Sequence, residues 1–92
     1  MHNKQQDLSE VEGKVLSLMY LEEMKDNSNL DNVNGKSGLD YKLFVKITKA
    51  LQDKGYIEGV DFAMTGRGPR VAFLNNAKLT ITGKEYIEKI NN

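Results

Sequence analysis

The sequence predicts an α+β domain with three main helices and a β-hairpin. Two segments with apolar residues at helical spacing come first, at residues 9–25 and 39–54. After residues 51–60 (LQDKGYIEGV) come two short β-rich runs around a glycine-rich turn, and a last helix begins near residue 80. This order of elements is typical of a winged helix, in which a hairpin of two or three strands forms the wing. We therefore predict one winged-helix domain over residues 1–92.

The first helix is expected over residues 9–25. Ser9 and Glu12 have the spacing of a capping box, in which each side chain accepts a hydrogen bond from the backbone amide of the other residue. Apolar residues then recur at spacings of three, four and three, which places them on one face: Leu8, Val11, Val15 and Leu18. The glutamates of this segment are expected to form an acidic exterior: Glu10, Glu12, Glu22 and Glu23.

Residues 26–38 (DNSNLDNVNGKSG) are rich in Asn, Asp, Ser and Gly, which favour turns through local hydrogen bonds and a permissive backbone. Only Leu30 and Val33 can anchor this segment to a core. A helix-turn-helix protein has its second helix at this position. We expect a loop or a single helical turn here, so that any second helix is very short.

Residues 39–54 form the clearest helix of the sequence, and Gly55 provides its stop. The face expected to be buried consists of Leu39, Leu43, Ile47, Ala50 and Leu51, with Phe44 at its edge. The opposite face is expected to present Tyr41, Val45, Thr48, Lys49 and Gln52. Lysines at spacings of four and three form a basic ridge on the outer surface: Lys42, Lys46 and Lys49.

Two strands and a last helix complete the predicted fold. Residues 56–62 and 71–74 have the β-branched and aromatic content of strands, and residues 65–69 (TGRGP) form the turn between them. The last helix follows, with Thr80 or Thr82 as its N-cap. Its inward-facing residues are expected to be Tyr86, Ile87 and Ile90.

Composition and charge limit the possible functions. The chain has 39% hydrophobic and 28% charged residues, as in an ordinary globular domain. No apolar run approaches the roughly 20 residues of a membrane span, and the N-terminus has no signal-peptide pattern. We therefore expect a cytoplasmic protein with no membrane partner. Residues 1–7 are polar and are expected to form a disordered tail.

The basic residues are concentrated in the second half of the chain. Net charge is zero, so that no overall field attracts nucleic acid. However, residues 40–78 contain seven basic and four acidic residues, whereas residues 1–26 contain three basic and six acidic ones. DNA binding requires cations near phosphates and a few side chains that reach base edges. The candidate nucleic-acid-binding residues are Tyr41, Lys42, Val45, Lys46, Thr48, Lys49, Arg67 and Arg70.

No catalytic or metal-binding pattern is evident in the sequence. The only histidine is His2, and there is no cysteine, so that the usual general base and thiolate ligands are missing. Gly35-Lys36-Ser37 matches the end of a phosphate-binding loop, but the first glycine of that motif would fall at Leu30. We therefore expect a binding protein that is not an enzyme and has no cofactor or metal.

Two segments carry a resemblance to a known family. The run from Leu51 to Val60 and the later pattern Leu79-Thr80-x-x-Gly83-x-x-Tyr86-Ile87 resemble the YjcQ-like family of small winged-helix proteins of Gram-positive bacteria and their phages. The resemblance implies three helices with a β-wing and a role in DNA binding or transcription regulation. Because many winged helices bind proteins instead, a protein-protein interaction module or self-association is the alternative.

Overall fold

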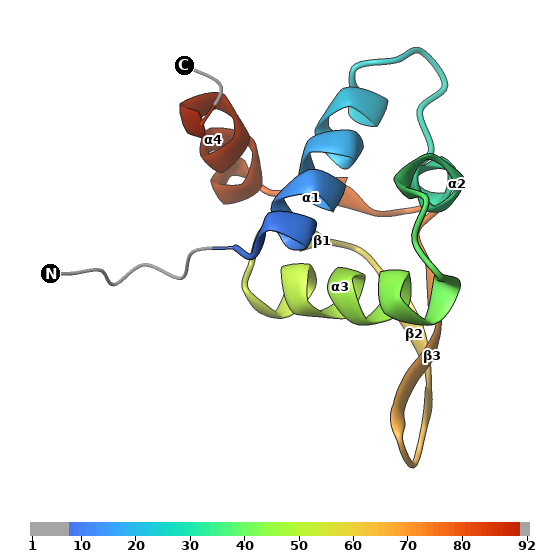
Figure 1. The fold of residues 1–92 in the computed structure, drawn as a ribbon. Coiled ribbons are helices and arrows are strands. Elements are labelled where there is room, and N and C mark those ends of the chain that lie inside the picture. Colours follow the sequence, from blue (N-terminus) through green and yellow to red (C-terminus); the bar gives the residue numbers. More distant parts are fainter. Residues whose placement is uncertain (1–7, 91–92) are drawn as a thin grey trace, which may run out of the picture.

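The computed structural model describes residues 8–90 and has an α+β fold compatible with a winged helix, which confirms the predicted class (Figure 1). Its elements are α1 (Glu10–Glu23), the 3₁₀ turn η1 (Leu30–Asn32), α2 (Val33–Ser37), α3 (Tyr41–Asp53), β1 (Ile57–Glu58), β2 (Asp61–Thr65), β3 (Gly68–Phe73), β4 (Lys78–Leu79) and α4 (Ile81–Ile90). Helix α1 packs against α2, α3 and α4, and the β2–β3 hairpin extends beyond α3. The predicted tail, residues 1–7, lies outside the described residues.

Helix α1 begins as predicted, but its glutamates are not all on the exterior. The Ser9 hydroxyl accepts a hydrogen bond from the Glu12 amide at 3.1 Å, and the Glu12 carboxylate accepts one from the Ser9 amide at 2.9 Å, so that the capping box is confirmed. Glu12 also forms an ion pair with Lys54 at 2.9 Å, and it is buried. Glu22 is buried as well. The expected acidic exterior is therefore wrong for these two residues, because both glutamates have cationic partners from later segments.

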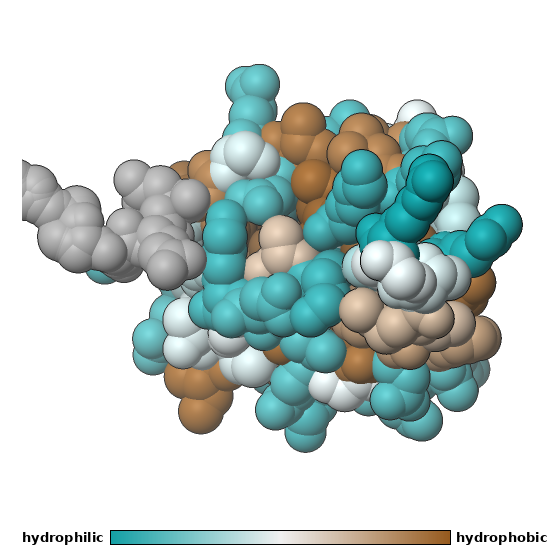
Figure 2. All heavy atoms as spheres, turned by 90° about the horizontal axis from the view of Figure 1, so that it is seen from below, coloured by the Kyte–Doolittle hydropathy of each residue, from teal (hydrophilic) through white to brown (hydrophobic). Residues whose placement is uncertain are grey.

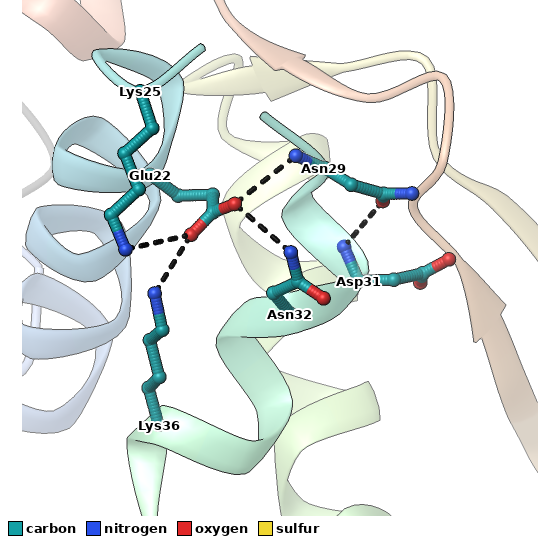
Figure 3. A network of polar contacts seen from close by, with 6 residues as sticks. All are labelled: Glu22, Lys25, Asn29, Asp31, Asn32 and Lys36. Carbon is teal, nitrogen blue, oxygen red and sulfur yellow. Dashed lines mark hydrogen bonds and ion pairs between the residues drawn. The ribbon is translucent and has the colours of Figure 1, made fainter. Parts of the chain in front are cut away.

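Buried Glu22 organises the polar segment that follows α1 (Figure 3). One carboxylate oxygen accepts hydrogen bonds from the Asn29 amide and the Asn32 side chain, both at 3.1 Å. The other oxygen lies 2.9 Å from the Lys36 amine and 3.6 Å from the Lys25 amine. The hydrogen bonds from Lys36, Asn32 and the Asn29 backbone lower the pKa of the Glu22 carboxyl from 4.5 to about 2. These contacts hold the segment that contains α2, a second helix of five residues, which agrees with the prediction that any second helix is very short.

Helix α3 is rotated from its predicted orientation. Its buried residues are Phe44, Val45, Thr48 and Leu51. Val45 and Thr48, which were predicted to face outward, are 1% and 0% exposed, whereas Leu43 is 41% exposed. Apolar residues occupy so much of the circumference of α3 that the sequence is compatible with two overlapping buried faces, the predicted one and the one that contains Val45. Packing against α1 on one side and β3 on the other decides between them.

The predicted strand 56–62 is two strands with different partners. Gly59, at φ 84°, separates β1 from β2, and a side chain there would collide with the backbone carbonyl of Asn76. Strand β1 pairs with β4, and β2 pairs with β3, both antiparallel. Each sheet therefore has only two strands, and the β2–β3 hairpin lies where the sequence predicted the wing.

Helix α4 is capped by Thr80, one of the two predicted caps. The Thr80 hydroxyl accepts a hydrogen bond from the Gly83 amide at 3.0 Å and donates one to the Gly55 carbonyl at 2.7 Å. Ile87 is buried, as predicted, but Ile90 is 55% exposed. The prediction for Ile90 was wrong: α4 reaches the core through Ile87 and approaches the Tyr56 backbone at Gly83, whereas Ile90 is its last residue. Among residues 8–90, no helix has the length and apolar character needed to cross a membrane.

Candidate nucleic-acid interface

An open cleft lies between the first half of α3 and the β2–β3 hairpin, with a volume of about 510 Å³. Helix α3 contributes Tyr41, Lys42 and Lys46 to its walls, and the hairpin contributes Thr65, Arg67, Pro69 and Arg70. Five of the eight predicted binding residues, Tyr41, Lys42, Lys46, Arg67 and Arg70, therefore lie together. Residues 41–46 and 65–70 are far apart in the sequence, so that the cleft is a product of the fold.

The cleft is basic, and its charges are not neutralised by nearby carboxylates. Lys42, Lys46, Arg67 and Arg70 form no ion pair with any residue between positions 8 and 90. Lysines outside the cleft, by contrast, include several that are paired with Glu or Asp side chains. Unpaired cations from two elements around one concave surface attract a polyanion. Figure 2 views the molecule from the side of α3 and the hairpin tip; hydrophilic side chains are spread over this face, and the most hydrophilic ones lie on the hairpin side.

Tyr41 is part of the cleft wall through its hydroxyl group. The Ala72 amide donates a hydrogen bond to the Tyr41 hydroxyl at 3.0 Å, and that hydroxyl lies 3.4 Å from the Ala72 carbonyl oxygen, to which it donates. The Tyr41 hydroxyl therefore ties the first turn of α3 to Ala72, near the end of β3. We conclude that Tyr41 helps set the distance between the two walls.

This contact leads to a prediction for Tyr41→Phe. The substitution keeps the ring but leaves the amide of buried Ala72 without its partner. We expect the free energy of unfolding to fall by about 1–2 kcal/mol in urea denaturation, because an unsatisfied buried amide retains its desolvation cost. Amide hydrogen exchange at Ala72 should become faster in the variant. Unchanged exchange at Ala72 would show that the hydroxyl does not hold the hairpin.

The hairpin presents its two arginines through irregular backbone. Gly66 and Arg67 form the tight turn, in which the Thr65 hydroxyl accepts from the Arg67 amide at 3.2 Å and donates to the Gly68 carbonyl at 3.0 Å. In the register, Ala63 pairs with Val71 but Met64 pairs with Pro69, so that Arg70 is the extra residue of a β-bulge. Successive side chains of a regular strand point to opposite faces, and a bulge interrupts this alternation. Neighbouring Pro69 and Arg70 can thus line the same cleft.

Three predicted binding residues are not in the cleft. Val45 and Thr48 are in the core. Lys49 forms an ion pair with Asp53 at 2.8 Å and lies 5.8 Å from the centre of the Phe62 ring. The basic ridge of α3 is therefore reduced to Lys42 and Lys46.

Thr65 and Pro69 line the cleft but were not predicted as binding residues. Their position beside Gly66 and Gly68 at the hairpin turn could have identified them as cleft residues from the sequence. Turn residues flanking an arginine at a hairpin tip determine where that arginine projects.

Comparison with known proteins places the chain in a family. No curated protein and no solved structure matches it significantly. A family model described as YjcQ protein matches residues 14–92, a range that contains both walls of the cleft and both segments on which the resemblance was based. Because the match covers nearly the whole sequence, the chain belongs to the YjcQ family.

Proposed function

We propose that this chain binds duplex DNA through the cleft between α3 and the hairpin, as a small transcriptional regulator of bacterial or phage origin. The observation that carries the proposal is a set of four basic side chains around one cleft that have no ion-pair partner within residues 8–90: Lys42, Lys46, Arg67 and Arg70. The proposed activity is binding, without catalysis and without a cofactor. Binding of this kind is mostly electrostatic and weakens as the salt concentration rises, because the counterions that the protein displaces from DNA then gain less entropy on release.

The shape of the two walls supports duplex DNA as the ligand. The B-DNA major groove is roughly 12 Å wide and admits an α-helix. With α3 against the groove, Lys42 and Lys46 would face phosphates. Arg67 at the hairpin tip would reach the neighbouring minor groove or its phosphates, as basic side chains on protein arms do. Four of the seven residues that line the cleft are cationic, whereas typical small-molecule sites are lined mainly by hydrophobic and aromatic side chains.

The test compares two double variants with the same change in charge. Lys46→Ala with Arg67→Ala removes one cation from each wall of the cleft. Lys84→Ala with Lys89→Ala removes two exposed cations from α4, at the opposite end of the molecule from the hairpin tip (Figure 1). Mixed-sequence duplex DNA is titrated by fluorescence anisotropy at low and physiological salt, with amide NMR shifts to map the face.

We expect the cleft variant to bind roughly tenfold or more weakly than the wild type, because two phosphate contacts are lost. The α4 variant should bind within twofold of the wild type. The wild-type shifts should concentrate in residues 41–46 and 65–70. Equal loss in both variants would mean that DNA responds only to net charge, and no binding by the wild type at low salt would refute the proposal.

A second candidate function is a protein-protein interaction module. Leu21, Met24 and Ile81 are 57%, 69% and 75% exposed. They lie near the end of α1 and the start of α4, where the Leu79 amide donates a hydrogen bond to Glu23. Sedimentation of the wild type and of Ile81→Ser tests self-association. A concentration-dependent mass that the substitution abolishes, together with absent DNA binding, would favour this second function.

A further inference from the structure

We infer that the cleft binds the sugar-phosphate backbone of DNA without selecting a base sequence. The inference rests on the proposed DNA binding and specifies its substrate class as duplex DNA of any sequence. The reason is that the side chains of α3 suited to reading bases are already engaged or buried. The cations that remain accessible are suited to phosphates.

Three side chains of α3 that could contact DNA bases are not available for this: Val45, Thr48 and Gln52. Small side chains with methyl groups recognise thymine methyls, and glutamine recognises adenine by a pair of hydrogen bonds. Val45 and Thr48 are in the core and cannot reach a ligand. Both ends of the Gln52 amide are used, because its nitrogen donates to the Val60 carbonyl at 3.1 Å and its oxygen accepts from the Val60 amide at 2.9 Å.

The remaining polar groups on α3 are constrained in the same way. The Tyr41 hydroxyl is hydrogen-bonded to the Ala72 backbone, and the Lys49 amine donates a hydrogen bond to the Asp53 carboxylate. The Asp40 carboxylate accepts a hydrogen bond from the Lys42 amide at the start of the helix. What α3 offers to DNA in the cleft is therefore the amines of Lys42 and Lys46. An ammonium group on a flexible stem is a point charge that accepts many phosphate positions.

The two arginines of the hairpin are not held in a reading geometry. A guanidinium that discriminates guanine makes two hydrogen bonds in a fixed plane, and its orientation depends on neighbouring groups that lock it. Within residues 8–90, neither the Arg67 nor the Arg70 guanidinium has a hydrogen bond or an ion pair. Arg67 lies in the turn at the hairpin tip, and Arg70 is the extra residue of the bulge in β3. Such groups contact phosphates, which position a protein on DNA but carry no sequence information.

A regulator built on this cleft would depend on a second copy or a partner for target choice.

The number of accessible cations also sets the salt dependence of the affinity. With at most four phosphates neutralised, the slope of log affinity against log salt is at most about −3.6, from roughly −0.9 per contact.

The experiment measures affinity for different sequences at several salt concentrations. The wild-type chain is titrated with unrelated duplexes of equal length, among them an A-tract, a GC-rich duplex and a mixed sequence. It is then used to select from a randomised duplex library. We expect dissociation constants within about threefold of one another, one common salt slope between about −3 and −3.6, and no enriched sequence.

Two single-site variants complete the experiment, one in the cleft and one control outside it. Lys42→Ala should lower the affinity for every duplex by the same factor and reduce the salt slope by about one. Lys84→Ala on α4 should change neither quantity. A selected sequence bound tenfold or more above the others, or a Lys42→Ala loss confined to one duplex, would overturn the inference while leaving DNA binding intact. Absence of binding to every duplex at low salt would overturn the proposed function itself.

Discussion

Gly83→Ala is expected to lower the free energy of unfolding by about 2 kcal/mol, although alanine is the better helix former. Gly83 lies in the first turn of α4, and a Cβ added there would overlap the backbone carbonyl of Tyr56. That carbonyl accepts a hydrogen bond from the Thr80 amide at 3.1 Å, so that neither backbone can withdraw freely. Overpacking of well-packed sites costs roughly 1–3 kcal/mol and occasionally more. Here it outweighs the helix propensity gain of about 1 kcal/mol.

The matched control for this prediction is Gly13→Ala in α1. A Cβ at Gly13 would meet no heavy atom within 4 Å, apart from its chain neighbours and the nearby helix backbone. We expect that variant to be more stable than the wild type by roughly 0.5–1 kcal/mol, because alanine loses less backbone entropy in a helix. Urea denaturation of both variants gives the two free energies. Effects of the same sign would refute the close contact between α4 and the backbone at Tyr56.

Glu22→Gln is expected to give the second large loss of stability. The carboxylate accepts hydrogen bonds from Lys36, Asn32 and Asn29, and these tie α2 to the end of α1. Glutamine removes the charge and replaces one acceptor oxygen by a donor. At pH 7 we expect the thermal midpoint to fall by roughly 5–15 °C, because hydrogen bonds to charged groups are the stronger ones and a small domain is sensitive to their loss. Glu85→Gln, at an exposed position on α4, should change the midpoint little.

The lowered pKa of Glu22 also fixes the sign of a pH effect. The pKa is about 2 in the folded protein, against an ordinary 4.5. A folded-state pKa below the unfolded value means that the carboxylate stabilises the fold above about pH 4.5 and loses this contribution as pH falls toward 2. The difference in thermal midpoint between wild type and Glu22→Gln should therefore shrink over that interval. A constant difference from pH 7 to pH 2 would contradict the assigned pKa.

The candidate cleft could be predicted from the sequence only in part. The basic residues on the helix and at the hairpin tip were recognisable from spacing and turn chemistry. Val45 and Thr48 were misassigned to the outer face, because helical periodicity gives the angular separation of residues but not the absolute rotation of the helix. That rotation depends on α1 and β3, which pack on α3 from distant positions in the sequence. The Tyr41–Ala72 hydrogen bond, across 31 residues, had no sequence signal.

The sequence by itself determined those features that depend on neighbours within about four residues. These are the α+β class, the capping box at Ser9, the turn around Gly66 and the shortness of α2, whereas Thr80 and Thr82 were both possible caps of α4 and the fold selected Thr80. Only the tertiary structure decided which face of α3 is buried, where strand 56–62 divides and why Glu22 is buried. Caps and turns are satisfied by local hydrogen bonds, whereas burial and pairing depend on surfaces that meet only when the chain has folded.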